Sequence, residues 1–186
     1  TGHKGLLGPQ GIGGFLISKE LDECMKPFIA GGTGSQSDSY DMPETLPDKY
    51  ESGTLNLPGI IGLHAALTYI EETGLESIHG RKMELTRYFL ERVSELPDIR
   101  IVGKKGLEDR VAVVSLDFLK TDNAMAAFEL ERQYGVMTRV GLHCAPLAHQ
   151  TLHTWPRGTV RFAFSAKNTK EEIDRCVEGV RAILSA

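Results

Sequence analysis

The pattern that most constrains this chain is the alternation of apolar periodicities after Pro58. Apolar residues recur every three or four positions in 60–70 and again in 75–96, which predicts two successive helices separated by Gly74. Beyond them we expect strands at 99–102, 111–117, 136–140 and 159–164 and helices at 121–134 and 169–183. Strands interleaved with helices of this length predict an α/β sandwich, in which helices cover one face of a sheet.

Capping residues mark the expected ends of the later helices. Thr121 is expected to cap one helix at its start and Gly135 to end it. Thr169 and Glu172 have the spacing of a capping box at the start of the last helix. The apolar stripes of the two helices before residue 97 are interpreted as ordinary core packing. They comprise Ile60, Leu63, Leu67, Ile70, Ile78, Leu85, Phe89, Val93 and Leu96.

The first 59 residues are less regular. An apolar run predicts a short buried strand over Gly11–Ser18, and Ser18 is expected to cap a short helix. Residues 31–59 are rich in Gly, Ser, Asp and Pro, which predicts a long irregular segment. Segments of this kind are often functional, and disorder over 35–47 is the alternative.

Lys4 lies in a glycine-rich opening stretch, between His3 and Gly5. Glycine lets the backbone approach a ligand closely, and a lysine amine becomes nucleophilic where burial or nearby cations lower its pKa. Lys4 is therefore a candidate for a Schiff base, with His3 and Thr1 as donors to a phosphate. The alternative is a surface lysine in a loop, and these residues alone do not decide between the two.

Cys144 lies in a run rich in Gly and Pro, residues 141–146, which predicts a loop where a thiol can meet a substrate. An adjacent cation lowers the pKa of a thiol, and His143 is the candidate neighbour. The alternative is a buried, inert thiol. That alternative fits Cys176, on the apolar face of the last helix, and Cys24, in a short helix.

A zinc site is a second interpretation of the same loop, because Cys144, His149 and His153 are spaced as Cys-x4-His-x3-His. His143 would supply a fourth ligand only if two adjacent residues splayed apart. No Cys-x-x-Cys pair completes the site, so we expect no metal here.

Composition narrows the class of protein. The 186 residues carry a net charge of −4, which argues against a nucleic-acid partner. Three cysteines at irregular spacing suit free thiols in a reducing cytoplasm. No apolar run is long enough for a membrane span, so we expect a cytoplasmic protein without a membrane partner.

Four stretches together resemble the class V aminotransferases and cysteine desulfurases, pyridoxal 5′-phosphate enzymes of fold type I. They are residues 1–4, 31–34, 50–56 and 139–145, and their order spans nearly the whole chain. The last stretch, Arg-x-Gly-x-His-Cys-Ala, is similar to the subgroup that includes selenocysteine lyases. Where many members of that subgroup have a second histidine, this chain has Leu142.

The resemblance implies a cofactor site. Lys4 would carry the internal aldimine of pyridoxal 5′-phosphate, and Thr1 and His3 would contact the cofactor phosphate. Thr54 would reach the phosphate of the cofactor in the neighbouring subunit, which implies a homodimer.

The resemblance also implies a domain organisation. Residues 1–59 would be the remainder of the large cofactor-binding domain, 60–97 bridging helices, and 98–186 the small C-terminal α/β domain. Fold type I enzymes carry most of the cofactor pocket upstream of the lysine. The chain is therefore expected to be a C-terminal fragment that is inactive by itself.

The function implied is removal of sulfur or selenium from a small amino acid substrate, which leaves alanine. Arg161 would bind the substrate carboxylate, and Cys144 would take the sulfur as a persulfide and pass it to a possible acceptor protein. Two alternatives stay open: a class V aminotransferase that uses Lys4 and Arg161 without the thiol, and a non-catalytic folded fragment that lacks the upstream pocket.

Overall fold

The computed structural model describes residues 1–185. Packing divides the chain into two compact units, Thr1–Gly74 and a second unit that begins at Leu75. The boundary falls between the two long helices expected before residue 97. The functional division into 1–59, 60–97 and 98–186 stays a prediction.

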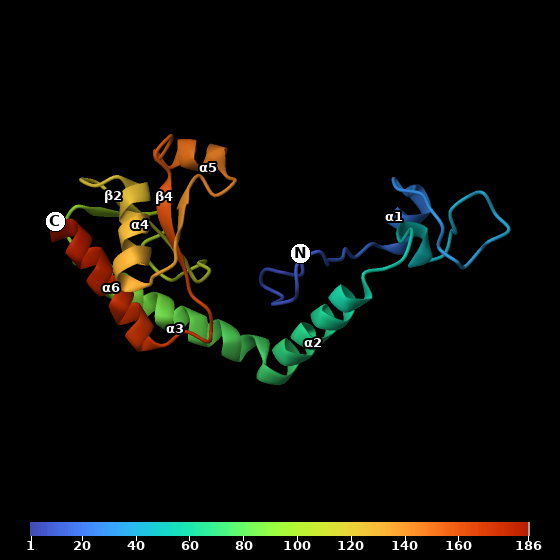
Figure 1. Cartoon of the computed structure of the whole chain (residues 1–186), viewed down its shortest axis with the longest axis horizontal. Coiled ribbons are helices and arrows are strands. Elements are labelled where there is room, and N and C mark those ends of the chain that lie inside the picture. The colour runs from blue at the N-terminus through green and yellow to red at the C-terminus, as the bar shows by residue number, and fades with distance from the viewer. Residues whose placement is uncertain (186) are drawn as a thin grey trace. The chain divides into compact units, whose positions relative to one another are not determined.

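The second unit is an α/β sandwich, as predicted. Its four antiparallel strands form one sheet in the order β1-β2-β4-β3. The strands are β1 (Ile99–Val102), β2 (Val113–Phe118), β3 (Arg139–Gly141) and β4 (Thr159–Ala163). The packed helices are α3 (Leu75–Val93), α4 (Asn123–Tyr134) and α6 (Lys170–Ser185), which lie together along one side of the sheet (Figure 1).

Strand alternation gives the sheet one apolar and one polar face. Val114 pairs with Phe162 and Leu116 with Val160, and all four side chains are buried in the same core as Phe89 of α3. Because successive side chains of a strand point to opposite faces, the residues between them point away from the helices. That second face holds the arginines described below.

The helix ends follow the predicted chemistry with one correction. Asp122, not Thr121, caps α4: its carboxylate accepts hydrogen bonds from the first backbone amides of the helix. Gly135 ends α4 with a left-handed φ of 65°. The capping box of α6 is confirmed, because the Glu172 amide donates to Thr169 Oγ1 at 3.2 Å and the Thr169 amide to Glu172 Oε2 at 3.0 Å.

The first unit contains α1 (Lys19–Cys24), a short 3-10 helix η1 (Asp48–Tyr50) and α2 (Leu57–Thr73), joined by irregular segments. Ser18 caps α1 as predicted, with its hydroxyl accepting from the Leu21 amide at 3.3 Å. The predicted strand at 11–18 is wrong, because these residues form neither a helix nor a strand. Leu16 in this stretch is fully exposed, so its apolar run has no neighbouring strand or helix to bury it.

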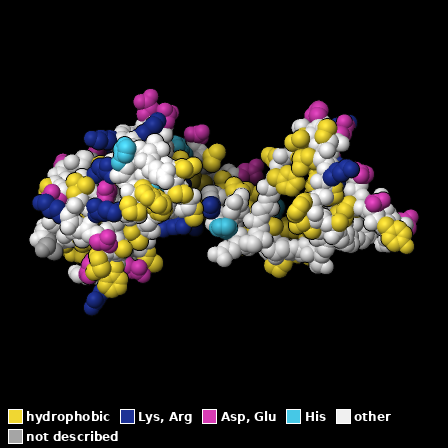
Figure 2. All heavy atoms as spheres, turned by 90° about the horizontal axis from the view of Figure 1, so that it is seen from above, with side chains coloured by type: hydrophobic (Ala, Val, Ile, Leu, Met, Phe, Trp, Pro, Cys, Tyr) yellow, Lys and Arg dark blue, Asp and Glu magenta, His cyan; other side chains and the backbone are white. Residues whose placement is uncertain are grey.

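Core packing was also wrongly predicted for α2. Ile60 is 38% exposed and Leu67 44% exposed, whereas α3 buries Leu85, Phe89 and Val93 completely. Within residues 1–74 the buried residues are Gly2, Pro43, Lys49 and Gly59, none of which has a large apolar side chain. The first unit thus leaves apolar side chains at its surface, and Figure 2 shows such side chains among the exposed groups.

Lys49 fastens the irregular segment of the first unit. Its ammonium group donates to the Asp22 backbone carbonyl at 2.7 Å and lies 3.3 Å from the carboxylate of the same residue. Tyr50 donates to that carboxylate at 2.9 Å. These bonds tie η1 to α1.

No helix within residues 1–185 is long and apolar enough to cross a bilayer.

The unequal burial predicts unequal resistance to proteolysis. In a trypsin time course, we expect cleavage after the exposed Lys19 to precede any cleavage within the strands of the sheet by at least about tenfold in time, since local opening costs little where few side chains are buried. Lys49 is the internal control, because its burial protects it relative to Lys19. Mass spectrometry identifies the products, and early cleavage after Arg100 or Arg161, which lie in β1 and β4, would contradict the expectation.

Candidate active site

The predicted site residues fall in both units, so each unit is described by itself. In the first unit, Lys4 lies in a closed turn. The Gly2 amide donates to the Ile12 carbonyl at 3.0 Å, the Gly8 amide to the Gly2 carbonyl at 2.8 Å, and the Leu7 amide to the Lys4 carbonyl at 3.0 Å. These bonds hold the backbone on either side of the lysine, while the Lys4 side chain is exposed.

Glycine is required in this turn because the backbone packs closely. A Cβ atom at Gly2 would lie 2.7 Å from the Ile12 carbonyl oxygen, and one at Gly8 would lie 2.9 Å from the Leu63 side chain of α2. A Cβ atom at Gly5 would meet nothing within 4 Å. The chain therefore holds the base of the turn rigidly and leaves open space directly beside Lys4.

The donors around Lys4 suit a phosphorylated aldehyde. None of the ion pairs within residues 1–185 uses the Lys4 amine. Thr1 and His3 are exposed in the same turn, and they offer a hydroxyl and an imidazole. An amine that takes part in none of these ion pairs, with open space and two donor side chains beside it, fits pyridoxal phosphate.

Thr54 lines a hollow of about 650 Å³ within the same unit. Other walls come from residues near the lysine turn, from the 3-10 helix and from α2. They include Ile12, Gly13, Tyr50, Ser52, Asn56, Ile60, Leu63 and His64. Gly13 also lies against Thr1, with a Cβ atom there 3.6 Å from the Thr1 Cα atom. The first unit thus brings the turn and the Thr54 segment together, and the phosphate contact of Thr54 stays a prediction.

In the second unit, Cys144 follows β3 on a tightly wound loop. Gly141 has a φ of 109°, and His143 and Cys144 have left-handed φ values of 52° and 59°. For residues with a Cβ atom this conformation costs about 1–2 kcal/mol each, so surrounding contacts must hold it. The Ala145 amide closes the turn on the Leu142 carbonyl at 2.8 Å, and the thiol is exposed.

Arg139, not His143, is the cation that contacts the thiol. Its guanidinium donates to Cys144 Sγ at 3.5 Å. Burial lowers the pKa of His143, the charges of Arg161, His149 and Arg139 lower it further, and a hydrogen bond to the Arg139 carbonyl opposes the shift. The lowered pKa favours the neutral form of His143, which leaves Arg139 as the cation beside the thiol.

Arg161 lies directly across the sheet from Arg139 in the register of β3 and β4. Two like charges opposite each other destabilise a sheet unless an anion lies between them. None of the ion pairs within residues 1–185 uses either guanidinium. Two guanidinium groups side by side suit a carboxylate, and the carboxylate contact of Arg161 stays a prediction.

The other expectations for thiols and metal ligands have mixed outcomes. Cys24 is exposed, so its predicted burial is wrong, because the first unit offers α1 no apolar layer. Burial of Cys176 is confirmed, and burial raises the pKa of its thiol to about 11. Among residues 1–185 no three metal-binding side chains converge, and His149 bonds to Thr154 at 2.7 Å rather than to a shared centre with Cys144.

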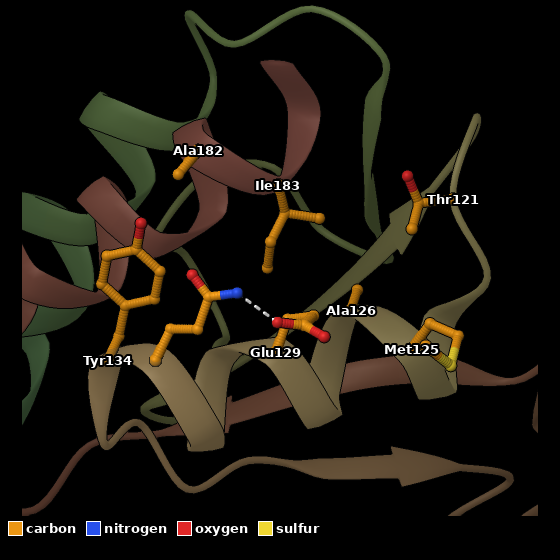
Figure 3. Close-up of a pocket in the computed structure, with 8 residues that line it drawn as sticks. Thr121, Met125, Ala126, Glu129, Tyr134, Ala182 and Ile183 are labelled. Atoms are coloured by element: carbon orange, nitrogen blue, oxygen red, sulfur yellow. Dashed lines mark hydrogen bonds between the residues drawn. The ribbon is translucent and has the colours of Figure 1, made fainter. Parts of the chain in front are cut away.

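A second hollow, of about 410 Å³, lies between α4 and α6 (Figure 3). Its walls include the apolar side chains of Met125, Ala126 and Ile183. Glu129 accepts a hydrogen bond from Gln133 of the same helix, marked by the dashed line in Figure 3. Because this acid is already engaged, the hollow offers less chemistry than the thiol loop.

Comparison with known proteins decides the family. The family described as Aminotransferase class-V matches residues 1–176. This chain belongs to the class V aminotransferase family. Pyridoxal phosphate is the cofactor of that family, and the fold is part of fold type I.

Within the class V family, the chain is similar to cysteine desulfurases. It is 34% identical over 184 residues to a probable cysteine desulfurase 2 of Mycobacterium leprae, which covers 97% of this chain and 43% of that protein. It is 31% identical to a cysteine desulfurase of Thermococcus onnurineus, with a TM-score of 0.89 over 100% of this chain and 46% of that one. It is 29% identical to the cysteine desulfurase CsdA of Escherichia coli, with a TM-score of 0.88 over 100% of this chain and 45% of that one. The chain thus spans less than half the length of these relatives.

Proposed function

We propose that this class V protein is a pyridoxal phosphate-dependent cysteine desulfurase, which releases sulfur from cysteine and leaves alanine. The observation that carries the proposal is the thiol loop: an exposed Cys144 bonded to Arg139, with the unpaired Arg161 guanidinium across the sheet. An aminotransferase needs the carboxylate site and the lysine but not a thiol held next to a cation. The same chemistry extends to selenocysteine, whose selenium leaves more readily.

The lysine turn would hold the cofactor. Lys4 would anchor the aldehyde covalently, Thr1 and His3 would contact the phosphate, and Thr54 would contact the phosphate of a second subunit in a homodimer. When bound, pyridoxal phosphate supplies the electron sink that weakens bonds around the substrate α-carbon. The Lys4 amine, once released from the cofactor, would carry a proton to and from that carbon.

The thiol loop would carry the sulfur transfer. Arg161 would hold the substrate carboxylate with a planar, bidentate fork. The Cys144 sulfur, with the Arg139 guanidinium beside it, would attack the substrate sulfur as a thiolate. An S–S bond forms as the C–S bond breaks, the electron pair goes to the substrate β-carbon, and that carbon takes a proton to give alanine. The outer sulfur of the Cys144 persulfide would then pass to the thiol of an acceptor protein in the cytoplasm.

Product analysis tests the function. We expect the full-length protein to release alanine and, with a thiol reductant, sulfide from cysteine in equal amounts. An aminotransferase would instead transfer the amino group to a keto acid and release no sulfide. A protein that neither binds the cofactor nor turns over cysteine would support the non-catalytic alternative.

The Arg161 side chain is expected to act on substrate binding. Replacing it with glutamine removes two charge-assisted hydrogen bonds to the carboxylate and should raise KM for cysteine by roughly 10- to 100-fold. Arg87→Gln is the matched control, because Arg87 is exposed on α3 and should leave KM unchanged. Steady-state kinetics measure both variants, and an unchanged KM in the Arg161 variant would remove this residue from the carboxylate site.

A further inference from the structure

His149 lies beneath the thiol loop and has no part in the mechanism above. It belongs to α5 (Pro146–Thr151), and only 7% of its surface is exposed. Its Nδ1 atom lies 2.7 Å from the hydroxyl oxygen of Thr154, which is itself 3% exposed. A buried imidazole is costly unless it is hydrogen-bonded, and the bond to Thr154 satisfies Nδ1 of His149. Replacing either partner alone with an apolar residue would leave the polar atom of the other buried and unpaired.

The bonds of Thr154 favour a hydrogen on Nδ1 of His149. The Thr154 hydroxyl reaches the His149 carbonyl at 3.4 Å, and the Thr154 amide donates to the same carbonyl at 2.8 Å. When the hydroxyl donates to that carbonyl, its oxygen accepts from Nδ1, and His149 carries its hydrogen on Nδ1. The ring is thereby held in one orientation by its own backbone.

His143 packs on this fixed ring. The two ring centroids are 5.6 Å apart with an angle of 41° between the planes. On its other side, His143 Nε2 lies 2.9 Å from the Arg139 carbonyl oxygen. A carbonyl only accepts, so Nε2 is the donor, and in the neutral ring Nδ1 is left as the acceptor. His143 thus joins the buried His149 to the residue that contacts the thiol.

We propose that His149, held by its hydrogen bond to Thr154, is a positioning residue that keeps the His143 ring on the Arg139 carbonyl. In this way it maintains the left-handed backbone conformation of His143 and Cys144. This inference rests on the proposed use of Cys144 as the nucleophile. It explains how two successive residues with side chains remain in a conformation that costs energy. It also separates the two histidines: His143 touches the loop, and His149 acts through it.

The test uses the 186-residue chain with Cys24→Ser, which removes the second exposed thiol. One readout is the rate of iodoacetamide alkylation of Cys144 at pH 7, followed by peptide mass spectrometry. The other is the nitrogen-proton correlation spectrum of the imidazoles, which reports whether His143 carries its hydrogen on Nε2. Neither readout needs cofactor or turnover, so failure of this inference and failure of the proposed function are distinguishable.

Four variants and one control separate positioning from packing. His149→Phe keeps a ring but loses Nδ1, and Thr154→Val keeps the shape but loses the hydroxyl. His149→Asn places an amide nitrogen where Nδ1 was, and Thr154→Ser keeps the hydroxyl. The control is His79→Phe, at an exposed position of α3.

We expect His149→Phe and Thr154→Val to abolish the Nε2–H signature of His143 and to slow alkylation of Cys144 by about three- to tenfold, the scale of one lost hydrogen bond. Thr154→Ser should retain both readouts. His149→Asn keeps the hydrogen bond to Thr154 but loses the ring on which His143 packs, so it should lose both readouts as the Phe variant does. An unchanged His143 signature in the Phe and Val variants would overturn the inference, as would an Asn variant that retains both readouts. If the His149 variants do not fold, the Val and Ser pair at Thr154 decides alone.

Discussion

Replacing Lys4 with alanine is expected to abolish covalent attachment of pyridoxal phosphate and to lower alanine release by roughly 10²- to 10⁴-fold, the scale of a lost proton-transfer group. The physical reason is that the turn leaves open space beside one unpaired amine and offers no second lysine there. Borohydride reduction of the loaded full-length protein, followed by peptide mass spectrometry, should place the cofactor on the peptide that contains Lys4.

Lys26→Ala is the matched control for this prediction. Lys26 is an exposed lysine of the same unit, and its loss should change neither the labelled peptide nor the rate. Binding of cofactor without covalent attachment in the Lys4 variant would agree with the prediction, because the phosphate donors remain. Labelling of another lysine in the unsubstituted protein would contradict it.

The fold of the second unit could be predicted because its core is made by its own residues. The patterns of β2 and β4 bury apolar side chains against helices of the same unit, so local periodicity and final burial agree there. Boundaries were less certain: β3 occupies 139–141 where a strand at 136–140 was expected, and α5 was not predicted at all.

The first unit could not be predicted in the same way. Its apolar stretches at 11–18 and along α2 have strand-like or helical periodicity, but the unit supplies no second apolar layer to cover them. Periodicity reports which face prefers burial and not which partner covers that face. The same reason explains why Cys24, read as a buried thiol, is exposed.

For the site, sequence reasoning identified the reactive groups and missed what holds them. Lys4, Cys144 and Arg161 were chosen by residue type and motif, and their roles stay predictions. The Arg139 contact with Cys144 depends on left-handed backbone at two residues other than glycine, for which the sequence carries no signal. The position of Arg139 opposite Arg161 depends on strand register, which pairs residues far apart in the chain.

Replacing Cys144 with alanine is expected to lower sulfide release from cysteine by about 10³-fold or more, as in enzymes that lose their nucleophile. Persulfide on this residue, trapped by alkylation and found by mass spectrometry, should disappear at the same time. Cofactor attachment to Lys4 should persist, because the lysine turn belongs to a unit that does not contain the thiol. The variant therefore separates loss of sulfur transfer from loss of the cofactor.

Two other cysteines make this prediction sharp. Cys24→Ala removes an exposed thiol that no cation contacts within the described residues, and this variant should leave the rate of sulfide release unchanged. Cys176 is buried, and its raised pKa keeps its thiol protonated at neutral pH. Full turnover of cysteine by the Cys144 variant would remove the thiol from the mechanism and favour the aminotransferase alternative. If the Cys144 variant retained turnover of selenocysteine alone, the thiol would keep its role with cysteine, because selenium leaves carbon more readily and need not be attacked by a thiolate.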